Sequence, residues 1–305
     1  GMCDMPFPRF AAVSLLAAAG WSVAYLLPGW ATGAAIRLPL PEGFWLQAGI
    51  VAASIAVMVG MSVNSSLRQH RRATIWISSM SLMILIGLFI GYPYLHALDQ
   101  GVMTLVQEHR QPMLDEIAVT FTLIGEFRNM LMFSALLTGL LLLCRQWRQA
   151  IFAGGVLLCT ALLNTVTKQF FARVRPEVLT DPLTSYSMPS GHASGSFALF
   201  LVLAVLAGRG QPPRMRLTWL LLGCIPALSI ALSRVYLGAH WPTDILAGAM
   251  LAACVCAAGL WLSQRKAPLN AMPFKVWWLI LPALLVLFSL FVLRHLPDTM
   301  LRYAY

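Results

Sequence analysis

The sequence contains few charged residues, few acids and little cysteine. Only 10% of its 305 residues are Asp, Glu, Lys or Arg, whereas ordinary globular chains carry about 25%. Hydrophobic residues make up 59% of the chain. This composition excludes a disordered or fibrous chain and argues against a soluble protein of several domains. It favours an integral membrane protein.

The six cysteines show no metal-binding spacing. Most of them lie inside apolar runs, where cysteine behaves as a small hydrophobic residue, so we expect neither a disulfide framework nor a zinc site. The net charge is +10, from 21 Lys and Arg against 11 Asp and Glu. The basic residues are scattered between apolar runs and form no clustered stripe, so membrane topology explains them and no nucleic-acid partner is expected.

Nine apolar runs approach the length of about 20 residues that a membrane-spanning helix needs. They lie at about 10–29, 44–63, 75–95, 127–144, 150–171, 193–208, 217–233, 244–262 and 276–293. We interpret the first run as a retained helix, because its flank holds only Arg9 against Asp4. A secretory signal followed by small residues at 31–34 is the alternative. The predicted fold is therefore an all-α polytopic membrane protein.

The loops between these runs predict an orientation. One set of loops holds twelve Lys and Arg and the other holds nine, three of which are assigned to a binding site below. The positive-inside rule then places the amino terminus in the cytoplasm and the carboxyl terminus outside. Ten of the eleven acidic residues, all but Asp4, fall on the outer side.

This topology divides the chain into three regions. Residues 1–72 form an amino-terminal helix pair that ends in a basic turn at 68–72. Residues 73–265 form a six-helix core, and residues 266–305 add one further helix and an outer tail. Within the core, the mixed apolar and acidic segment at about 99–126 predicts interfacial helices.

Polar residues gather at the outer ends of four consecutive runs. A charged side chain at bilayer depth costs at least about 2.5–3.5 kcal/mol, so such residues are rare and usually functional. The clusters are Lys168–Pro176 after the fifth run, Pro189–His192 before the sixth, Ser233–Arg234 after the seventh and His240–Asp244 before the eighth. The predicted topology does not depend on these clusters, yet it places all four on one side of the membrane.

The residue types in these clusters suit a phosphate group. Lys168, Arg175 and Arg234 supply three positive charges, and arginine binds phosphate oxygens in a bidentate way. Ser190 stands at a helix N-cap position, where free backbone N–H groups attract anions. Gly191 has no Cβ, so an oxyanion can approach its backbone closely.

The same clusters supply acid–base or nucleophilic chemistry. His192 and His240 can serve as an acid and as a base or nucleophile near neutral pH. Asp244 follows His240 by four residues at a helix start, with Pro242 favoured at the first helical position. At that spacing the carboxylate can hold one imidazole nitrogen and leave the other as a nucleophile.

Together these clusters resemble the three signature motifs of the type 2 phosphatidic acid phosphatase (PAP2) superfamily. The motifs read Lys-x6-Arg-Pro at 168–176, Pro-Ser-Gly-His at 189–192 and Ser-Arg-x5-His-x3-Asp at 233–244. All three are complete and in order, and the resemblance covers about residues 75–265. The segment between the first two motifs, Glu177–Met188, is short, so no lid domain is inserted there.

The resemblance implies a metal-free phosphatase that needs no cofactor and works through a phosphohistidine. In this sequence His240 would attack phosphorus, Asp244 would orient it, and His192 would protonate the leaving oxygen. The other matched groups would bind the phosphoryl oxygens: Lys168, Arg175, Ser190, the Gly191 amide and Arg234. Water would then hydrolyse the phosphoenzyme.

The expected function is hydrolysis of a lipid phosphate or pyrophosphate at the outer leaflet of a bacterial inner membrane. Candidate substrates are undecaprenyl and other polyprenyl pyrophosphates, phosphatidate, phosphatidylglycerol phosphate and lipid A phosphate. Membrane lipids are the expected partners, and no obligate protein partner is inferred. Two alternatives stay open, namely a phosphotransferase acting on a lipid acceptor such as lipid A, and a phospholipid transporter, which would have no use for a nucleophile.

Other residues near the motifs are expected to have lesser roles. On a helix, Arg173 would point away from Arg175 and would act as a headgroup contact or a supporting cation. Tyr186, Tyr236 and Trp241 are expected at headgroup level. The remaining histidines are expected in loops or at the interface, namely His70, His96, His109 and His295.

Overall fold

The computed structural model describes residues 36–67, 72–179 and 183–302, together with isolated residues before position 36. The chain divides into two compact units, residues 1–42 and 43–305. All four polar clusters belong to the second unit. The described residues of that unit form helices and connecting loops, with no β-strand among them. The predicted all-α class is confirmed.

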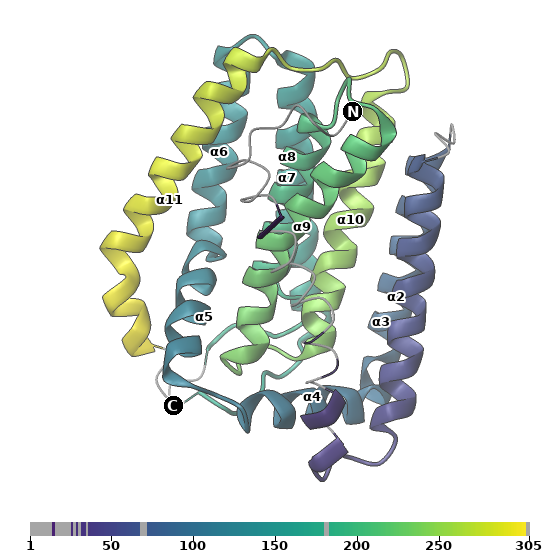
Figure 1. The fold of residues 1–305 in the computed structure, drawn as a ribbon, viewed down its shortest axis with the longest axis vertical. Coiled ribbons are helices and arrows are strands. Elements are labelled where there is room, and N and C mark those ends of the chain that lie inside the picture. The colour runs from purple at the N-terminus through teal and green to yellow at the C-terminus, as the bar shows by residue number, and fades with distance from the viewer. Residues whose placement is uncertain are drawn as a thin grey trace. The chain divides into compact units, whose positions relative to one another are not determined.

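The second unit is a bundle of long helices (Figure 1). The long helices are α2 (Phe44–Leu67), α3 (Ala73–Gly91), α6 (Phe127–Leu143), α7 (Trp147–Phe171), α8 (Gly191–Ala207), α9 (Pro213–Tyr236), α10 (Pro242–Ser263) and α11 (Phe274–Arg302). Between α3 and α6 lie the 3-10 helix η2 (Tyr92–Tyr94), α4 (His96–Gln107) and α5 (Pro112–Ile124). The helices from α6 to α11 alternate in direction, so their connecting loops fall at the two ends of the bundle (Figure 1).

Six of the described helices are long and apolar enough to cross a membrane, namely α2, α3, α7, α9, α10 and α11. The pair α5 and α6, bent by 52°, makes a seventh candidate, and α8 is a shorter apolar helix. Eight of the nine predicted apolar runs therefore coincide with a helix. The first run, at 10–29, and most of the basic turn at 68–72 lie outside the described residues. The chain is a multi-pass membrane protein, and the total of nine spans stays a prediction.

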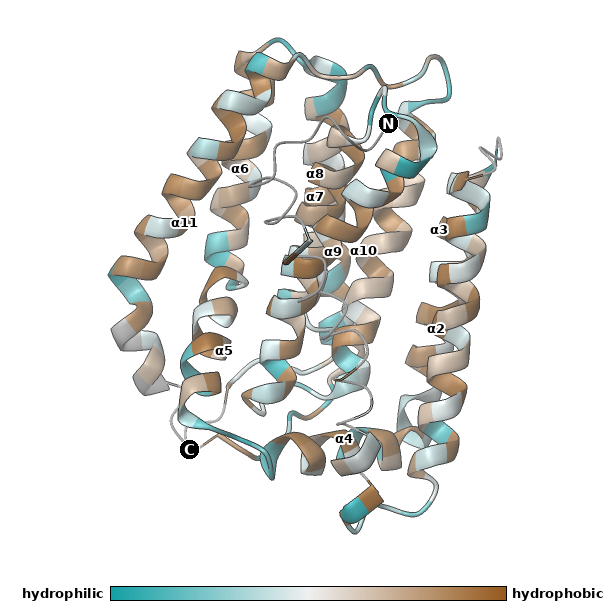
Figure 2. Cartoon of the chain, in the orientation of Figure 1, coloured by the Kyte–Doolittle hydropathy of each residue, from teal (hydrophilic) through white to brown (hydrophobic). Residues whose placement is uncertain are grey.

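The core of the unit surrounds α8. This helix packs against α7, α9 and α10, and Val202 lies fully buried among Phe152 of α7 and Ile230 of α9 in one apolar cluster. Gly248 lets α10 approach the start of α8, because a Cβ there would lie 2.7 Å from the Ser190 carbonyl oxygen. The apolar colour on the outward sides of α2, α3 and α11 (Figure 2) is what a lipid-facing surface requires.

The two shorter helices, α4 and α5, differ from the long ones. α4 runs in another direction, and α5 continues into α6. α4 lies across one end of the bundle (Figure 1), and Gln47 of α2 ties it there by accepting the Leu98 N–H at 2.8 Å. α5 runs into α6 across a bend at Gly125 and Glu126. The apolar pattern predicts a fourth run that begins at residue 127, with α5 among interfacial helices, whereas the structure joins α5 to α6 as a bent pair.

Candidate active site

The four polar clusters predicted from the sequence meet at one end of the bundle. α7 and α9 end there, and α8 and α10 begin there, because consecutive helices run antiparallel. This is also the end that α4 crosses (Figure 1). The antiparallel order of the helices therefore brings together residues that lie up to 76 positions apart in the chain, from Lys168 to Asp244.

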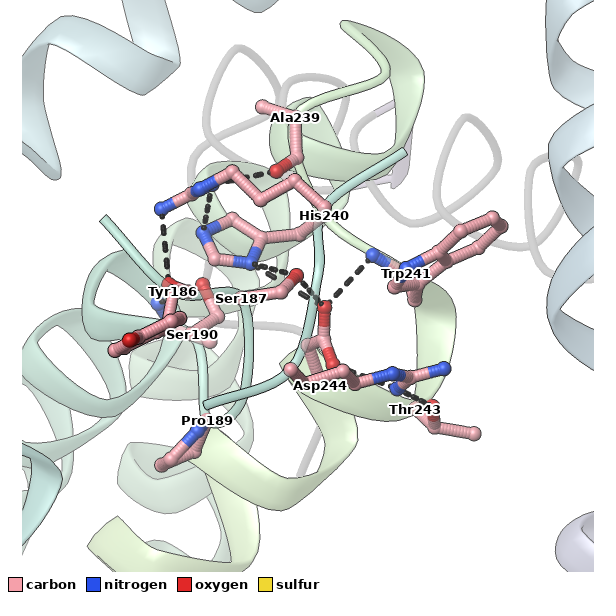
Figure 3. A network of polar contacts seen from close by, with 12 residues as sticks. Tyr186, Ser187, Pro189, Ser190, Ala239, His240, Trp241, Thr243 and Asp244 are labelled. Carbon is pink, nitrogen blue, oxygen red and sulfur yellow. Dashed lines mark hydrogen bonds and ion pairs between the residues drawn. The ribbon is translucent and has the colours of Figure 1, made fainter. Parts of the chain in front are cut away.

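His240 lies at the centre of the cluster (Figure 3). It sits in the loop between α9 and α10 and is fully buried. Its Nε2 lies 3.0 Å from Nη1 of Arg175, and its Nδ1 lies 3.4 Å from Oδ2 of Asp244. A guanidinium can only donate hydrogen bonds, so Nε2 accepts this one and Nδ1 carries the ring proton. Nε2 is therefore the nitrogen whose lone pair, here accepting from Arg175, could attack an electrophile.

The environment of His240 also fixes its charge. Burial lowers the pKa of His240 well below its ordinary value of 6.5, and the positive charges of Arg175, Arg234 and Lys168 lower it further. The imidazole is therefore neutral at physiological pH, because both desolvation and neighbouring cations disfavour imidazolium. A nucleophile needs this neutral state.

Each carboxylate oxygen of Asp244 has its own set of partners. Oδ2 accepts the Trp241 backbone N–H at 2.9 Å and a short hydrogen bond from the Ser187 hydroxyl. Oδ1 accepts from Nη1 of Arg173 at 2.7 Å. The Ser187 Oγ also lies 3.3 Å from Nδ1 of His240. The sequence spacing predicts Asp244 directly against the imidazole, whereas the Ser187 hydroxyl stands between them (Figure 3).

Lys168 and Arg175 converge on one backbone carbonyl. Lys168 Nζ donates to the Tyr186 carbonyl oxygen at 2.9 Å, and Arg175 Nη2 donates to the same oxygen at 3.3 Å. Nη1 of Arg175 also donates to the Ala239 carbonyl oxygen at 2.6 Å. Two of the three predicted phosphate-binding cations thus lie side by side next to His240.

Arg234 completes the set of cations from inside the bundle. It is 1% exposed and donates through Nη1 to the Thr122 hydroxyl of α5 at 2.8 Å. Its backbone carbonyl accepts the N–H groups of Ala239 and His240 at 2.9 and 3.2 Å. The same residue therefore supplies a buried charge and closes the loop that carries His240.

The Pro-Ser-Gly-His segment forms the expected helix start. Ser190 is the N-cap of α8, where its hydroxyl accepts the Ala193 N–H at 3.4 Å and its own N–H binds the Asp244 carbonyl oxygen at 3.0 Å. Gly191 faces Asn164, whose Oδ1 would lie 3.4 Å from an added Cβ. Nε2 of His192 is buried and has no hydrogen-bond partner among the described residues. That nitrogen is free to meet a ligand.

Arg173 was expected on a helix, as a headgroup contact or a supporting cation. α7 ends at Phe171, and Ala172 adopts left-handed φ and ψ of 45° and 34°. The chain then runs on without helical structure. Arg175 contacts His240, whereas Arg173 contacts the carboxylates of Asp244 and Asp99. Arg173 bridges two acids, Asp244 at 2.7 Å and Asp99 at 2.6 Å. Its side chain is only 10% exposed, so it is a buried bridge and not a headgroup contact.

Sequence reasoning missed several residues of this site. Ser187 stands three positions before Ser190, where nothing in composition or spacing marks it. Asp99 is fully buried on α4 and accepts both the backbone N–H and the hydroxyl of Thr243, at 3.0 and 2.7 Å. Asp99 could have been predicted from its position, because it is a single acidic residue on the apolar face of an amphipathic helix. Trp241, expected at headgroup level, lies with its ring 5.6 Å from the Arg173 guanidinium.

Within the described part of the chain, no three His, Cys, Asp or Glu side chains are grouped so that they could hold a metal ion. The positive charge at the site comes from side chains instead. The expectation that no cofactor is needed stays a prediction.

Comparison with known proteins identifies the family. Residues 149–268 match the PAP2 superfamily. Phosphatidylglycerophosphatase B of Bacillus subtilis (strain 168) is 30% identical over 145 residues, which cover 46% of this chain and 70% of that protein. The chain belongs to the PAP2 superfamily. This PAP2 chain is also 35% identical to the undecaprenyl-diphosphatase of Sulfolobus acidocaldarius over 113 residues, which cover 33% of the chain but only 46% of that relative.

A solved structure supports the fold. The crystal structure of a transmembrane PAP2 type phosphatidylglycerolphosphate phosphatase from Bacillus subtilis aligns with a TM-score of 0.56 at 22% identity. The alignment covers 62% of this chain and 97% of that one. The motif-based prediction of a PAP2 lipid phosphatase is confirmed at the level of family and enzyme class. Its substrate and its catalytic steps are proposals.

Proposed function

We propose that this PAP2 enzyme hydrolyses a lipid phosphate or pyrophosphate at the outer leaflet of a bacterial inner membrane through a phosphohistidine on His240. The observation that carries the proposal is the Nε2 of His240. It is unprotonated, lies 3.0 Å from the Arg175 guanidinium, and belongs to an imidazole whose other nitrogen faces Asp244 and Ser187. A nucleophile thus lies beside a phosphate-binding cation.

The first step forms the phosphoenzyme. Nε2 of His240 attacks phosphorus while the bond from phosphorus to the leaving oxygen breaks. Lys168, Arg175 and Arg234 bind the phosphoryl oxygens, whose charge such fixed cations stabilise. The imidazole ring becomes positively charged, and the ionised Asp244 carboxylate stabilises it across the Ser187 hydroxyl. The negative charge of the bound phosphate favours the protonated form of His192, which gives its Nε2 proton to the leaving oxygen.

The second step releases phosphate. The now neutral His192 takes a proton from a water molecule, and the water oxygen attacks phosphorus. The bond between phosphorus and Nε2 breaks, inorganic phosphate leaves, and His192 is protonated again for the next cycle. Every proton given up in the first step is thereby recovered.

A lipid substrate is supported by the surroundings of the cations. Phe170 and Val174 lie between Lys168 and Arg175 in the sequence, and these two residues are 80% and 75% exposed. Exposed apolar side chains beside a cationic site suit a ligand with a charged head and an apolar tail. The names of the relatives favour two substrate classes, polyprenyl pyrophosphates and glycerolipid phosphates such as phosphatidylglycerol phosphate.

The outer-leaflet assignment is supported by the opposite end of the bundle. The loops there carry Lys and Arg but no Asp or Glu. The described basic residues of these loops and of the first helical turns that follow them are Arg72, Arg145, Arg148, Arg209, Arg214, Arg216, Arg265, Lys266 and Lys275. A basic end without acids belongs in the cytoplasm under the positive-inside rule. The site, at the other end, would then face outward.

The test is phosphate release by the full-length chain in detergent. Phosphatidylglycerol phosphate, undecaprenyl pyrophosphate and phosphatidate are supplied under one set of conditions, with and without EDTA. We expect turnover of at least one lipid class, unchanged by EDTA. No phosphate from any of them would favour a transporter, and loss on chelation that Mg²⁺ restores would overturn the metal-free mechanism. Transfer to an added acceptor lipid, seen by mass spectrometry of the products, would favour a phosphotransferase.

A further inference from the structure

A buried ion-pair network lies on the side of Asp244 away from His240. Arg173 donates through Nη1 to Oδ1 of Asp244 and to the Thr243 hydroxyl, both at 2.7 Å. Through Nη2 it donates to Oδ2 of Asp99 at 2.6 Å. One guanidinium thus joins a carboxylate of the crosswise helix α4 to a carboxylate at the start of α10. None of these contacts involves His240 itself.

The network is closed and nearly sealed from solvent. Oδ1 of Asp99 accepts the Thr243 backbone N–H at 3.0 Å, and Oδ2 accepts the Thr243 hydroxyl at 2.7 Å. Both carboxylate side chains are fully buried, and that of Arg173 is 10% exposed. Its guanidinium also lies 4.8 Å from the Tyr92 ring centre. Groups held by this many directional contacts have few alternative rotamers.

The position of Arg173 decides which way Asp244 faces. A carboxylate is free to rotate about its Cβ–Cγ bond, and rotation would exchange the two oxygens and tilt their plane. With Oδ1 bound to Arg173, Oδ2 is the oxygen that meets Ser187, the Trp241 N–H and His240. Asp99 in turn fixes the orientation of Arg173. The planar guanidinium can donate to the carboxylates of Asp99 and Asp244 at the same time only in one orientation.

We infer that Arg173 and Asp99 are positioning residues that act on the reaction through Asp244. This inference rests on the proposed function, in which Asp244 stabilises the charge that develops on His240. Neither residue touches the phosphate or the reacting nitrogen. Their effect is to keep Oδ2 of Asp244 aimed at the Ser187 hydroxyl and the imidazole, and misplacement of a catalytic group by about 1 Å can cost on the order of 100-fold in rate.

The test is a double-mutant cycle on the full-length enzyme. The combined change Asp99→Asn/Arg173→Gln removes one negative and one positive charge, so the net charge of the network is unchanged, and Asp244 keeps its hydrogen bonds from Ser187 and the Trp241 N–H. It is made in the native and the Asp244→Asn backgrounds. The matched control is Arg110→Gln/Asp115→Asn, which neutralises another ion pair, of 3.1 Å, between the α4–α5 loop and α5. Both kcat and KM for the best lipid substrate are measured, together with thermal unfolding in detergent.

In the native background, we expect kcat to fall about 10- to 100-fold, with KM changed less than about threefold. In the Asp244→Asn background the same change should cost less than about threefold, since residues acting through one partner are not additive. Equal losses in both backgrounds, no loss in the native one, or a loss confined to KM would overturn the inference. Should the pair variant fail to fold, Arg173→Lys, which keeps the charge but loses the fork, replaces it in the same cycle.

The proposed function is tested separately by the same proteins. If His240→Ala turns over normally, the phosphohistidine mechanism fails. Suppose instead that His240→Ala is inactive and Asp244→Asn is impaired, but Asp99→Asn/Arg173→Gln lowers kcat equally in the native and the Asp244→Asn backgrounds. The mechanism then stands and the positioning role fails.

Discussion

The Ser187 hydroxyl lies between the carboxylate of Asp244 and Nδ1 of His240, donating to the first and standing 3.3 Å from the second. The direct distance from Nδ1 to the carboxylate is longer, at 3.4 Å. Ser187 is fully buried, so water cannot replace its hydroxyl easily. The contacts around the imidazole of His240 therefore include a residue outside the three motifs.

Replacing Ser187 by Ala should slow the reaction without weakening substrate binding. The methyl group leaves Oδ2 of Asp244 with one fewer donor, and a lost buried hydrogen bond to a charged group costs about 1.5–3 kcal/mol. We expect kcat to fall about 10- to 100-fold with KM nearly unchanged. Steady-state kinetics of Ser187→Ala test this, with Ser229→Ala as the control, because Ser229 bonds the backbone of its own helix. Unchanged kcat would show that Ser187 has no part in orienting Asp244.

The motifs predicted which residues meet, but not how their supporting contacts are arranged. Lys168, Arg175, His240 and Asp244 could be found from the sequence because charge in an apolar chain is conspicuous. The extended course of the chain after Phe171 could not, since it depends on Ala172 adopting a left-handed conformation. Arg173 lies just after that break and bridges Asp99 and Asp244, so it is a buried cation and not a headgroup contact. Asp99 was missed because its partners, Arg173 and Thr243, lie 74 and 144 residues away in the chain.

For the helices, too, the sequence predicted some features and missed others. Apolar length predicted eight helices where the structure has them, because crossing a bilayer demands such runs. The bend between α5 and α6 was missed, since Gly125 and Glu126 interrupt the apolar pattern and made α5 look like a separate interfacial segment. The bend matters for the site, because it brings Gly125 against His192.

Gly125→Ala should therefore disturb His192. An added Cβ would lie 2.4 Å from Cγ2 of Ile230 and 2.8 Å from Cδ2 of His192, and forced overpacking of this kind costs about 1–3 kcal/mol. We expect lower activity and a lower unfolding temperature in detergent. Gly139→Ala on α6 is the matched control, because nothing lies within 4 Å of its added Cβ among the described residues. Equal activity of the two variants would show that the contact with His192 is unimportant.

The role of His192 as a general acid predicts a dependence on the leaving group. An alkoxide needs a proton to leave, whereas a phosphate group leaves readily without one, because its second pKa is near 6. His192→Gln should therefore reduce kcat much more for phosphatidate than for a polyprenyl pyrophosphate. Comparing the two substrates with the same variant measures the difference. A uniform loss on both would assign His192 to phosphate binding instead.

The neutral state of His240 predicts activity into the acid range. Burial and the charge of Arg175 lower the pKa of His240 well below 6.5, so His240 stays unprotonated as the pH falls through that value. The acid limb of kcat/KM assigned to His240 should accordingly lie below pH 6.5. Arg175→Gln removes one of the cations that disfavour imidazolium, so that limb should move to higher pH, along with a large drop in rate. A limb that does not move would mean that another group controls it.

The most direct measurement traps the phosphoenzyme. A lipid phosphate labelled with ³²P at the scissile group is mixed with the full-length enzyme, quenched in alkali within milliseconds, and the labelled peptide is identified. We predict an alkali-stable, acid-labile label on His240, absent in His240→Ala and present in the control His295→Asn. Rapid turnover by His240→Ala, or a label on a different residue, would contradict the phosphohistidine account.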